Sequence, residues 1–175
     1  MGSQPPIEVV PLGGAIEATW TVPGSKSMTN RGLVLAALSE GTTELRGVLH
    51  SDDTRHMANA LRGMGIDVEN VGETTMVVRG GKSKLRVPDK PLFIGNSGTT
   101  VRFLTAMATL VPGPVTFEGD EHMAKRPISD LVDALRQRVP RVVQLPRAPA
   151  RAPRVCRPHR SGLGVGFSFE QRNGL

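Results

Sequence analysis

The sequence predicts an α/β (α+β) fold, and three observations support that prediction. Short β-prone runs alternate along the first 137 residues with stretches whose apolar residues recur at helical spacing. Turns rich in Gly, Ser and Thr stand directly before the helical stretches, where capping residues are expected. The triplets Ala60-Leu61-Arg62 and Ala134-Leu135-Arg136 lie near the ends of two predicted helices with similar patterns. Their separation indicates repeated α/β units of roughly seventy residues.

The first elements are predicted from apolar runs. Ile7–Val10 and Ala15–Val22 are typical of short strands. The apolar stretch Leu33–Leu38 continues a helix that starts within Pro23–Arg31. Thr43–Leu49 alternates as the next strand, which leads into the second helix.

The second helix carries the clearest start and stop signals. Ser51 is the predicted N-cap, and Asp52 and Asp53 in the first turn interact favourably with the helix dipole. Gly65 is typical of a helix end. The apolar residues that recur along one face of this helix are Met57, Ala60, Leu61 and Met64.

The segments after this helix predict a hairpin, a further strand and two helices. Ile66–Glu69 and Thr75–Arg79 flank a Val-Gly-Glu turn and are expected to pair as a hairpin. Lys84–Val87 is predicted as another strand. Val101–Leu110 is predicted as a helix, and a last helix is expected to begin near Pro127. We expect Arg55 and Arg102 to pair locally. The candidate core residues are Leu33, Leu35, Leu38, Phe103, Leu104, Leu131 and Leu135.

The run P-G-S-K-S-M-T-N-R, residues 23–31, is the most informative motif for function. A turn feeding a helix gathers free backbone N–H groups and the positive end of the helix dipole, which together attract an anion. Lys26, Ser27 and Arg31 add cationic and hydroxyl donors at the same place. The alternative interpretation is an ordinary helix cap with a solvated lysine.

Two further motifs favour the binding site over the ordinary cap. F-I-G-N-S-G-T-T, residues 93–100, places Asn96 and Gly98 in a turn between a short strand and a helix. G-D-E-H-M-A-K-R-P, residues 119–127, delivers Lys125 and Arg126 directly before another helix. Three junctions with anion donors are difficult to explain by capping alone, so we expect a site for phosphate or carboxylate groups.

These motifs, with S-D-D-T-R-H-M and K-R-P-I-S-D-L-V-D-A-L-R, resemble the N-terminal part of 5-enolpyruvylshikimate-3-phosphate (EPSP) synthases. The resemblance runs in order from about Ile7 to Gln137. It implies an enolpyruvyl-transferase fold of repeated β-α-β-α-β-β units, with two similar domains that close on their ligands. Residues 1–22 would be opening strands that belong to the second domain, and residues 23–137 a partial first domain of about two units.

The resemblance also implies the chemistry. The family transfers the enolpyruvyl group of phosphoenolpyruvate to the 5-hydroxyl of shikimate 3-phosphate, in the pathway to the aromatic amino acids. Lys26, Ser27 and Arg31 would hold shikimate 3-phosphate, and Lys26 would also be catalytic. The residues implied at phosphoenolpyruvate are Lys26, Asn96, Gly98 and Arg126. No cofactor is implied, and a complete protein would be a cytoplasmic monomer.

Residues 138–175 differ from the rest in composition. They hold eight arginines and one acid, whereas residues 1–137 hold 14 Lys+Arg and 15 Asp+Glu. An Arg/Pro-rich segment without a helical or strand period is expected to be disordered or non-native. It could bind nucleic-acid phosphates or serve as a linker, but it lacks aromatic interleaving. We favour a third interpretation, a shifted reading frame or altered exon after Gln137.

Other features narrow the function. Cys156 is the only cysteine and the four histidines lack ligand spacing, so neither a disulfide framework nor a metal site is expected. No apolar run reaches the length of a membrane span, and no targeting segment is evident. Because the family's proton donors and acceptors lie in later parts of the chain, we expect this fragment to be inactive and prone to aggregation.

Two alternatives stay open from the sequence. One is a non-catalytic remnant that binds shikimate 3-phosphate without turnover. The other is a relative of the UDP-N-acetylglucosamine enolpyruvyl transferases, which share the fold and phosphoenolpyruvate. The S-K-S-M-T-N-R continuation and the absence of a cysteine from residues 1–137 argue against the second alternative.

Overall fold

The computed structural model describes residues 8, 11, 13–15, 17–137, 142–144 and 165–167. The helices are α1 (Lys26–Leu38), α2 (Asp52–Gly63), α3 (Gly98–Ala108), α4 (Glu121–Ala124) and α5 (Ser129–Arg136), with a 3₁₀ turn η1 (Lys82–Lys84). The strands are β1 (Gly41–Arg46), β2 (Asp67–Asn70), β3 (Thr75–Gly80), β4 (Leu92–Phe93), β5 (Val115–Glu118), β6 (Val142–Gln144) and β7 (Val165–Phe167). The predicted α/β fold is confirmed.

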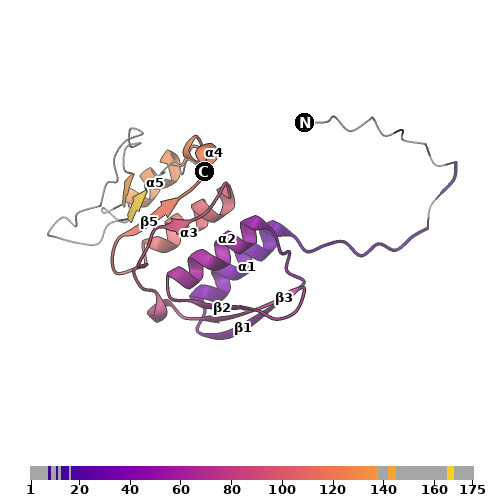
Figure 1. Cartoon of the computed structure of the whole chain (residues 1–175), viewed down its shortest axis with the longest axis horizontal. Helices are drawn as coiled ribbons and strands as arrows, with labels where there is room; N and C mark the ends of the chain where they lie inside the picture. The colour runs from indigo at the N-terminus through magenta and orange to yellow at the C-terminus, as the bar shows by residue number, and fades with distance from the viewer. Residues whose placement is uncertain are drawn as a thin grey trace, which may run out of the picture.

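The first half of the described chain forms a helix-covered antiparallel sheet. Its strand order is β1-β3-β2, and β2 and β3 pair in the register that opposes Val68 to Val78. Helices α1 and α2 lie side by side over this sheet (Figure 1). Along β3 the side chains of Met76 and Val78 are buried under the helices, which follows from the two-residue period of a strand.

The second half is built around parallel strands. β4 pairs with β5 in parallel, with Leu92 opposite Phe117, and α3 forms the crossover between them. This is the usual way to connect parallel strands, because the chain must return to the same end of the sheet. The sheet continues through β7 to β6 in the order β4-β5-β7-β6.

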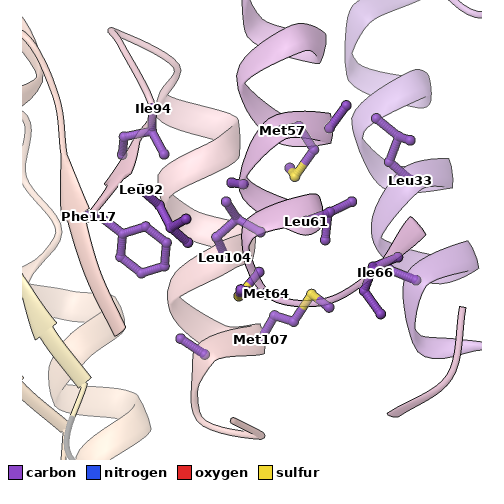
Figure 2. Close-up of a cluster of buried hydrophobic side chains, with 14 of the residues drawn as sticks. Leu33, Met57, Leu61, Met64, Ile66, Leu92, Ile94, Leu104, Met107 and Phe117 are labelled. Carbon is purple, nitrogen blue, oxygen red and sulfur yellow. The ribbon is translucent and has the colours of Figure 1, made fainter. Parts of the chain in front are cut away.

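One hydrophobic core joins the two halves. Leu33 of α1, Leu61 of α2 and Leu104 of α3 are all fully buried in it. Figure 2 shows these side chains in a row between the helices, with Phe117 of β5 at the α3 side. The core therefore fixes α3 against α2 and α2 against α1, which decides where the N-terminal ends of the three helices lie.

Exposed charged pairs lie on the antiparallel sheet, one within β1 and one between β2 and the central strand β3. Arg46 Nε donates to Glu44 Oε1 at 2.8 Å, and this hydrogen bond lowers the pKa of the Glu44 carboxyl below its ordinary value. Hydrogen bonds to Asp67 and Glu69 raise the pKa of Arg79 above its ordinary value. Both pairs are solvent-exposed, so they contribute little to stability.

Most predicted elements are confirmed, with boundaries that shift by a few residues. The hairpin forms as expected, and Ser51 caps α2 with a capping box in which Thr54 returns a hydrogen bond. The strand predicted at Thr43–Leu49 is observed as β1. Of the core candidates, Leu33 and Leu104 are buried, and the partly buried ones that pack against the core are Leu38, Phe103, Leu131 and Leu135.

Several expectations are wrong. Residues 17–22 of the predicted strand Ala15–Val22 form no strand and are exposed, because no strand among the described residues pairs with them. Lys84–Val87 is also not a strand: Leu85 is buried after the η1 turn, and Arg86 N donates to Met64 O. Leu35 is exposed, since it lies on the face of α1 that turns away from the sheet and the other helices. Of the predicted strand Ile7–Val10, all but residue 8 lies outside the described residues.

The region before and after residue 137 also differs from expectation. Residues 121–124 form the unpredicted helix α4, whose N-cap Asp120 accepts a hydrogen bond from Met123 N at 2.8 Å. The last helix begins at Ser129, two residues after the Pro127 near which its start is predicted. In the Arg/Pro-rich segment, residues 142–144 and 165–167 form the short parallel strands β6 and β7, although the sequence shows no strand period there. The rest of residues 138–175, apart from β7, lies outside the described residues.

Gly80 offers a test of this packing. A Cβ at Gly80 would press against the carbonyl oxygens of Ala36 and Ser39, which are backbone atoms at the end of α1 and cannot rotate away. We expect Gly80→Ala to lower the free energy of unfolding by about 1–3 kcal/mol. The measurement is urea unfolding followed by circular dichroism.

The matched control is Gly32→Ala within α1. Its nearest neighbour would be the flexible Leu45 side chain at 3.3 Å, and alanine favours the helix. The free energy of unfolding should then change by less than about 1 kcal/mol. Equal stability of the Gly80 and Gly32 variants would contradict the packing described for β3 and α1.

Candidate anion-binding site at three helix N-termini

The N-terminus of α1 forms the first part of the site. Ser25 is the N-cap, and its hydroxyl oxygen accepts a hydrogen bond from Met28 N at 3.4 Å. Lys26, the first residue of the helix, extends its Nζ to within 3.1 Å of Asp53 Oδ2. The Lys26 side chain is 49% exposed, so its ammonium group is paired with Asp53 and still open to a ligand from solvent.

Arg31 lies one turn further along α1 and is exposed. Its Nη1 donates to Ser27 O at 3.1 Å, and its guanidinium lies 5.7 Å from the centroid of the Phe103 ring on α3. A cation over an aromatic face is attracted by the negative face of the ring. The Arg31 side chain therefore extends from α1 toward α3. Its other guanidinium N–H groups are available to bind a carboxylate.

The start of α3 is held against the start of α2. Ser97 caps α3 by accepting a hydrogen bond from Thr100 N at 3.3 Å, and the two hydroxyls lie 2.7 Å apart. The Thr100 hydroxyl also donates to Asp53 O at 3.4 Å. Because Asp53 pairs with Lys26 through its side chain, this one residue of α2 contacts the first turns of both α1 and α3.

The segment before α5 closes the site on the other side. Arg126 Nε donates to Asn96 Oδ1 at 2.9 Å. A Cβ at Gly98 would lie 2.7 Å from Arg126 Nη1, so the guanidinium lies directly over the first turn of α3. Arg102 supports this arrangement by donating to Gly98 O and Pro127 O, each at 3.2 Å.

A buried hydroxyl network holds α1 and α2 together near the site. Leu49 N donates to Thr29 Oγ1 at 3.0 Å, and Thr54 Oγ1 donates to Leu49 O at 2.8 Å. Thr29 and Thr54 are both buried, and each belongs to the first turn or two of its helix. The segment between β1 and α2 is thereby tied to both helix starts.

The arrangement suits an anionic ligand. The N-termini of α1, α2 and α3 converge, and each presents backbone N–H groups and the positive end of its dipole. Lys26, Arg31 and Arg126 supply fixed positive charge, and Arg groups bind carboxylate and phosphate through two parallel hydrogen bonds. Within the described ranges, no cluster of three or more His, Cys, Asp or Glu side chains could hold a metal ion.

The structure brings the predicted residues into one connected set. Arg126 contacts both Asn96 and Gly98, and Lys26 is linked to the start of the same helix, α3, through Asp53 and Thr100. The backbone carbonyl of Ser27 accepts a hydrogen bond from Arg31, whereas its hydroxyl makes no hydrogen bond to another described residue. Arg55 pairs with Asp52 at 2.7 Å, as expected from the sequence.

Sequence reasoning missed the ion pair of Asp53 with Lys26. From the sequence, Asp52 and Asp53 are predicted as cap and dipole residues of α2, and contact with the site is the less favoured alternative. The signal in the sequence that could have indicated this ion pair is the position of Asp53 at the start of a helix, because the helix starts that carry the three motifs are expected to lie close together.

Within the described ranges, no helix is both long and apolar enough to cross a membrane.

The fold and site define a class: an α/β protein, built from a partial domain, in which cationic side chains and helix N-termini meet at one place. The family model for EPSP synthase (3-phosphoshikimate 1-carboxyvinyltransferase) matches residues 10–145, and the chain belongs to this family. The match extends past Gln137 to residue 145, a stretch that includes β6.

Named relatives agree with this membership. A 3-phosphoshikimate 1-carboxyvinyltransferase of Rhizobium leguminosarum is 52% identical over 130 residues, which cover 74% of this chain and 31% of the relative. One from Pseudomonas savastanoi is 42% identical over 166 residues, covering 95% of this chain and 38% of the relative. The chain therefore spans about a third of the length of its curated relatives.

A solved structure matches as well. The EPSP synthase from Acinetobacter baumannii superimposes with a TM-score of 0.64 at 34% sequence identity. The superposition covers 67% of this chain and 27% of that protein. The enolpyruvyl-transferase fold expected from the motifs is thus confirmed for a part of one domain.

Asp53 provides a test of the site's electrostatics. Its carboxylate opposes any anion that approaches Lys26, so Asp53→Asn should tighten binding of inorganic phosphate by about three- to fourfold. The measurement is a phosphate titration followed by amide chemical shifts. Asp52→Asn is the matched control, because Asp52 pairs with Arg55 instead. Weaker phosphate binding by the Asp53 variant than by the control would contradict the proposed competition.

Proposed function

We propose that this chain is the N-terminal portion of an enolpyruvyl transferase of the shikimate pathway. The whole protein would transfer the enolpyruvyl group of phosphoenolpyruvate to the 5-hydroxyl of shikimate 3-phosphate. The observation that supports the proposal best is the convergence of three helix N-termini with Lys26, Arg31 and Arg126. Each substrate carries a phosphate and a carboxylate, so the site must hold about four anionic groups at once.

The proposed roles follow from the two sides of the site. Arg31 and Ser27 on α1 bind shikimate 3-phosphate, with Arg31 at the carboxylate. Asn96, Gly98 and Arg126 line the phosphoenolpyruvate side, where the guanidinium already lies over the start of α3. Lys26 lies between the two sides and contacts both phosphoenolpyruvate and the attacking hydroxyl.

In the proposed reaction the 5-hydroxyl oxygen forms a bond to C2 of phosphoenolpyruvate and gives a tetrahedral intermediate. Elimination then breaks the C2–O bond to phosphate and restores the double bond. The hydroxyl proton leaves, while C3 of phosphoenolpyruvate gains a proton and later returns one. The residues of this chain bind the anionic groups, orient the reactants and stabilise charge, which are large contributions in such reactions.

The same proposal implies that the isolated chain does not catalyse the transfer reaction. This chain matches about a third of the length of its curated relatives. We infer that the general acids and bases of the family lie in the remaining two thirds. General acid–base catalysis contributes about 10²- to 10⁴-fold in typical enzymes. Without those groups and without a second domain to exclude water, substrates would bind weakly and not turn over.

We therefore expect the pure 175-residue chain to release no phosphate from phosphoenolpyruvate and shikimate 3-phosphate above background. Adding a second polypeptide that carries the remaining two thirds of a complete relative should restore turnover. The assay measures inorganic phosphate over hours at high protein concentration. Turnover by the isolated chain would contradict the proposed division of labour.

Arg31 tests the binding part of the proposal separately. Loss of a charge-assisted hydrogen bond to a carboxylate should weaken shikimate 3-phosphate binding by about tenfold in Arg31→Ala. Arg46→Ala is the control, because Arg46 is an exposed arginine on β1 that pairs with Glu44. Isothermal titration calorimetry measures both dissociation constants.

The same titration separates the alternative function. The alternative is a non-catalytic remnant that binds shikimate 3-phosphate through the exposed side chains of Lys26 and Arg31. It predicts the Arg31 effect together with no turnover even after the second polypeptide is added. No shikimate 3-phosphate binding by the unaltered chain would exclude both the transferase portion and the remnant.

A further inference from the structure

His56 of α2, which is not part of the site described above, packs against the turn that carries Asn96. Gly95, which precedes Asn96, is buried and has a φ of +55°, a left-handed conformation that favours glycine. A Cβ at Gly95 would lie 2.6 Å from His56 Nε2 and 2.9 Å from His56 Cδ2. The imidazole therefore fills the space directly against the Gly95 backbone.

The imidazole is itself oriented by an aromatic neighbour. The rings of His56 and Phe93 meet edge to face, with their centroids 5.3 Å apart and their planes at 77°. Such an arrangement is the preferred geometry for two aromatic rings. Phe93 ends β4, two residues before Gly95, so the ring that orients His56 belongs to the same strand-to-turn segment.

The opposite side of the turn is held by the segment before α4. Asp120 N donates to Gly95 O at 3.2 Å, and a Cβ at Gly119 would lie 2.8 Å from the same oxygen. Gly95 is thus enclosed between α2 and residues 119–120. Any gap on the α2 side would let the turn move toward the space left by the imidazole.

The position of Gly95 determines where the adjacent residue, Asn96, lies. Asn96 is exposed, and its Oδ1 accepts the 2.9 Å hydrogen bond from Arg126 Nε. Among the contacts of the described residues, this is the one that ties the Arg126 side chain to the turn before α3. The direction of the Asn96 side chain follows from the backbone of the turn, so the orientation of Arg126 depends on what fixes Gly95.

We propose that His56 is a positioning residue that fixes the Gly95–Asn96 turn and, through Asn96, orients Arg126 for an anionic group of the ligand. The identity of this ligand as phosphoenolpyruvate rests on the proposed function. The orientation of Arg126 itself rests only on the contacts described above. His56 does not need to touch the ligand or exchange a proton with it.

The experiment uses the full chain with ¹⁵N labelling of arginine side chains. In the unaltered chain the Arg126 Nε–H should give a distinct signal that is protected from exchange by Asn96. His56→Ala should broaden or shift this signal and weaken phosphoenolpyruvate binding by about tenfold, the factor for one charged hydrogen bond. His50→Ala is the control, because His50 is an exposed histidine just before the cap of α2.

A second variant guards against a folding defect. Phe93→Leu keeps an apolar side chain at a half-exposed position but removes the ring that orients His56, and it should also shift the Arg126 signal. An unchanged Arg126 signal in either folded variant overturns the proposal. If the unaltered chain does not bind phosphoenolpyruvate, the proposed function fails, while the Arg126 signal still decides the role of His56.

Discussion

The site depends above all on the packing of α2 between α1 and α3. Leu61 of α2 is fully buried in the core that also takes in Leu33 and Leu104, and this burial fixes the lateral positions of all three helices. Asp53, in the first turn of α2, then reaches Lys26 with its carboxylate and Thr100 with its carbonyl. Apolar burial stabilises the packing of the three helices, while the polar contacts of Asp53 set how the helices are aligned along their axes, so that their N-termini lie together.

Bringing three helix N-termini together has an electrostatic cost. Their dipoles present like partial charges to one another, and two cations, Lys26 and Arg126, stand among them. Asp52 and Asp53 at the start of α2 offset part of this positive potential in the absence of a ligand. An anion that binds the site meets a preorganised, positive environment and needs little rearrangement of the protein, which is how electrostatic binding sites gain their strength.

The chain also has the character of a partial domain. The relatives continue for about twice the length matched here, and Met28 and Leu35 lie exposed two turns apart on one face of α1. Trp20 and Val22, in the segment before α1, are exposed as well. Exposed apolar side chains of this kind are expected where further structure would pack.

Local features of the sequence determined much of the fold. Ser25, Ser51 and Ser97 each cap a helix because a hydroxyl can accept from the free N–H groups of the first turn. The period of the apolar residues identified α1, α2, α3 and the hairpin, since burial of one face needs only a regular spacing. The cationic site residues were found for the same reason: a turn with Lys or Arg before a helix is a local pattern.

Only the tertiary structure decided which of these local features meet. The pairing of Lys26 with Asp53, the position of Arg126 over Gly98 and the packing of His56 against Gly95 all join residues that are distant in the sequence. The same holds for the errors. Lys84–Val87 has the composition of a strand, but no strand in the described part of the chain pairs with it. The short helix α4 begins at the cap that Asp120 supplies. Strand pairing and side-chain contact depend on neighbours in space, and a single sequence specifies those neighbours only through the packing of the whole core.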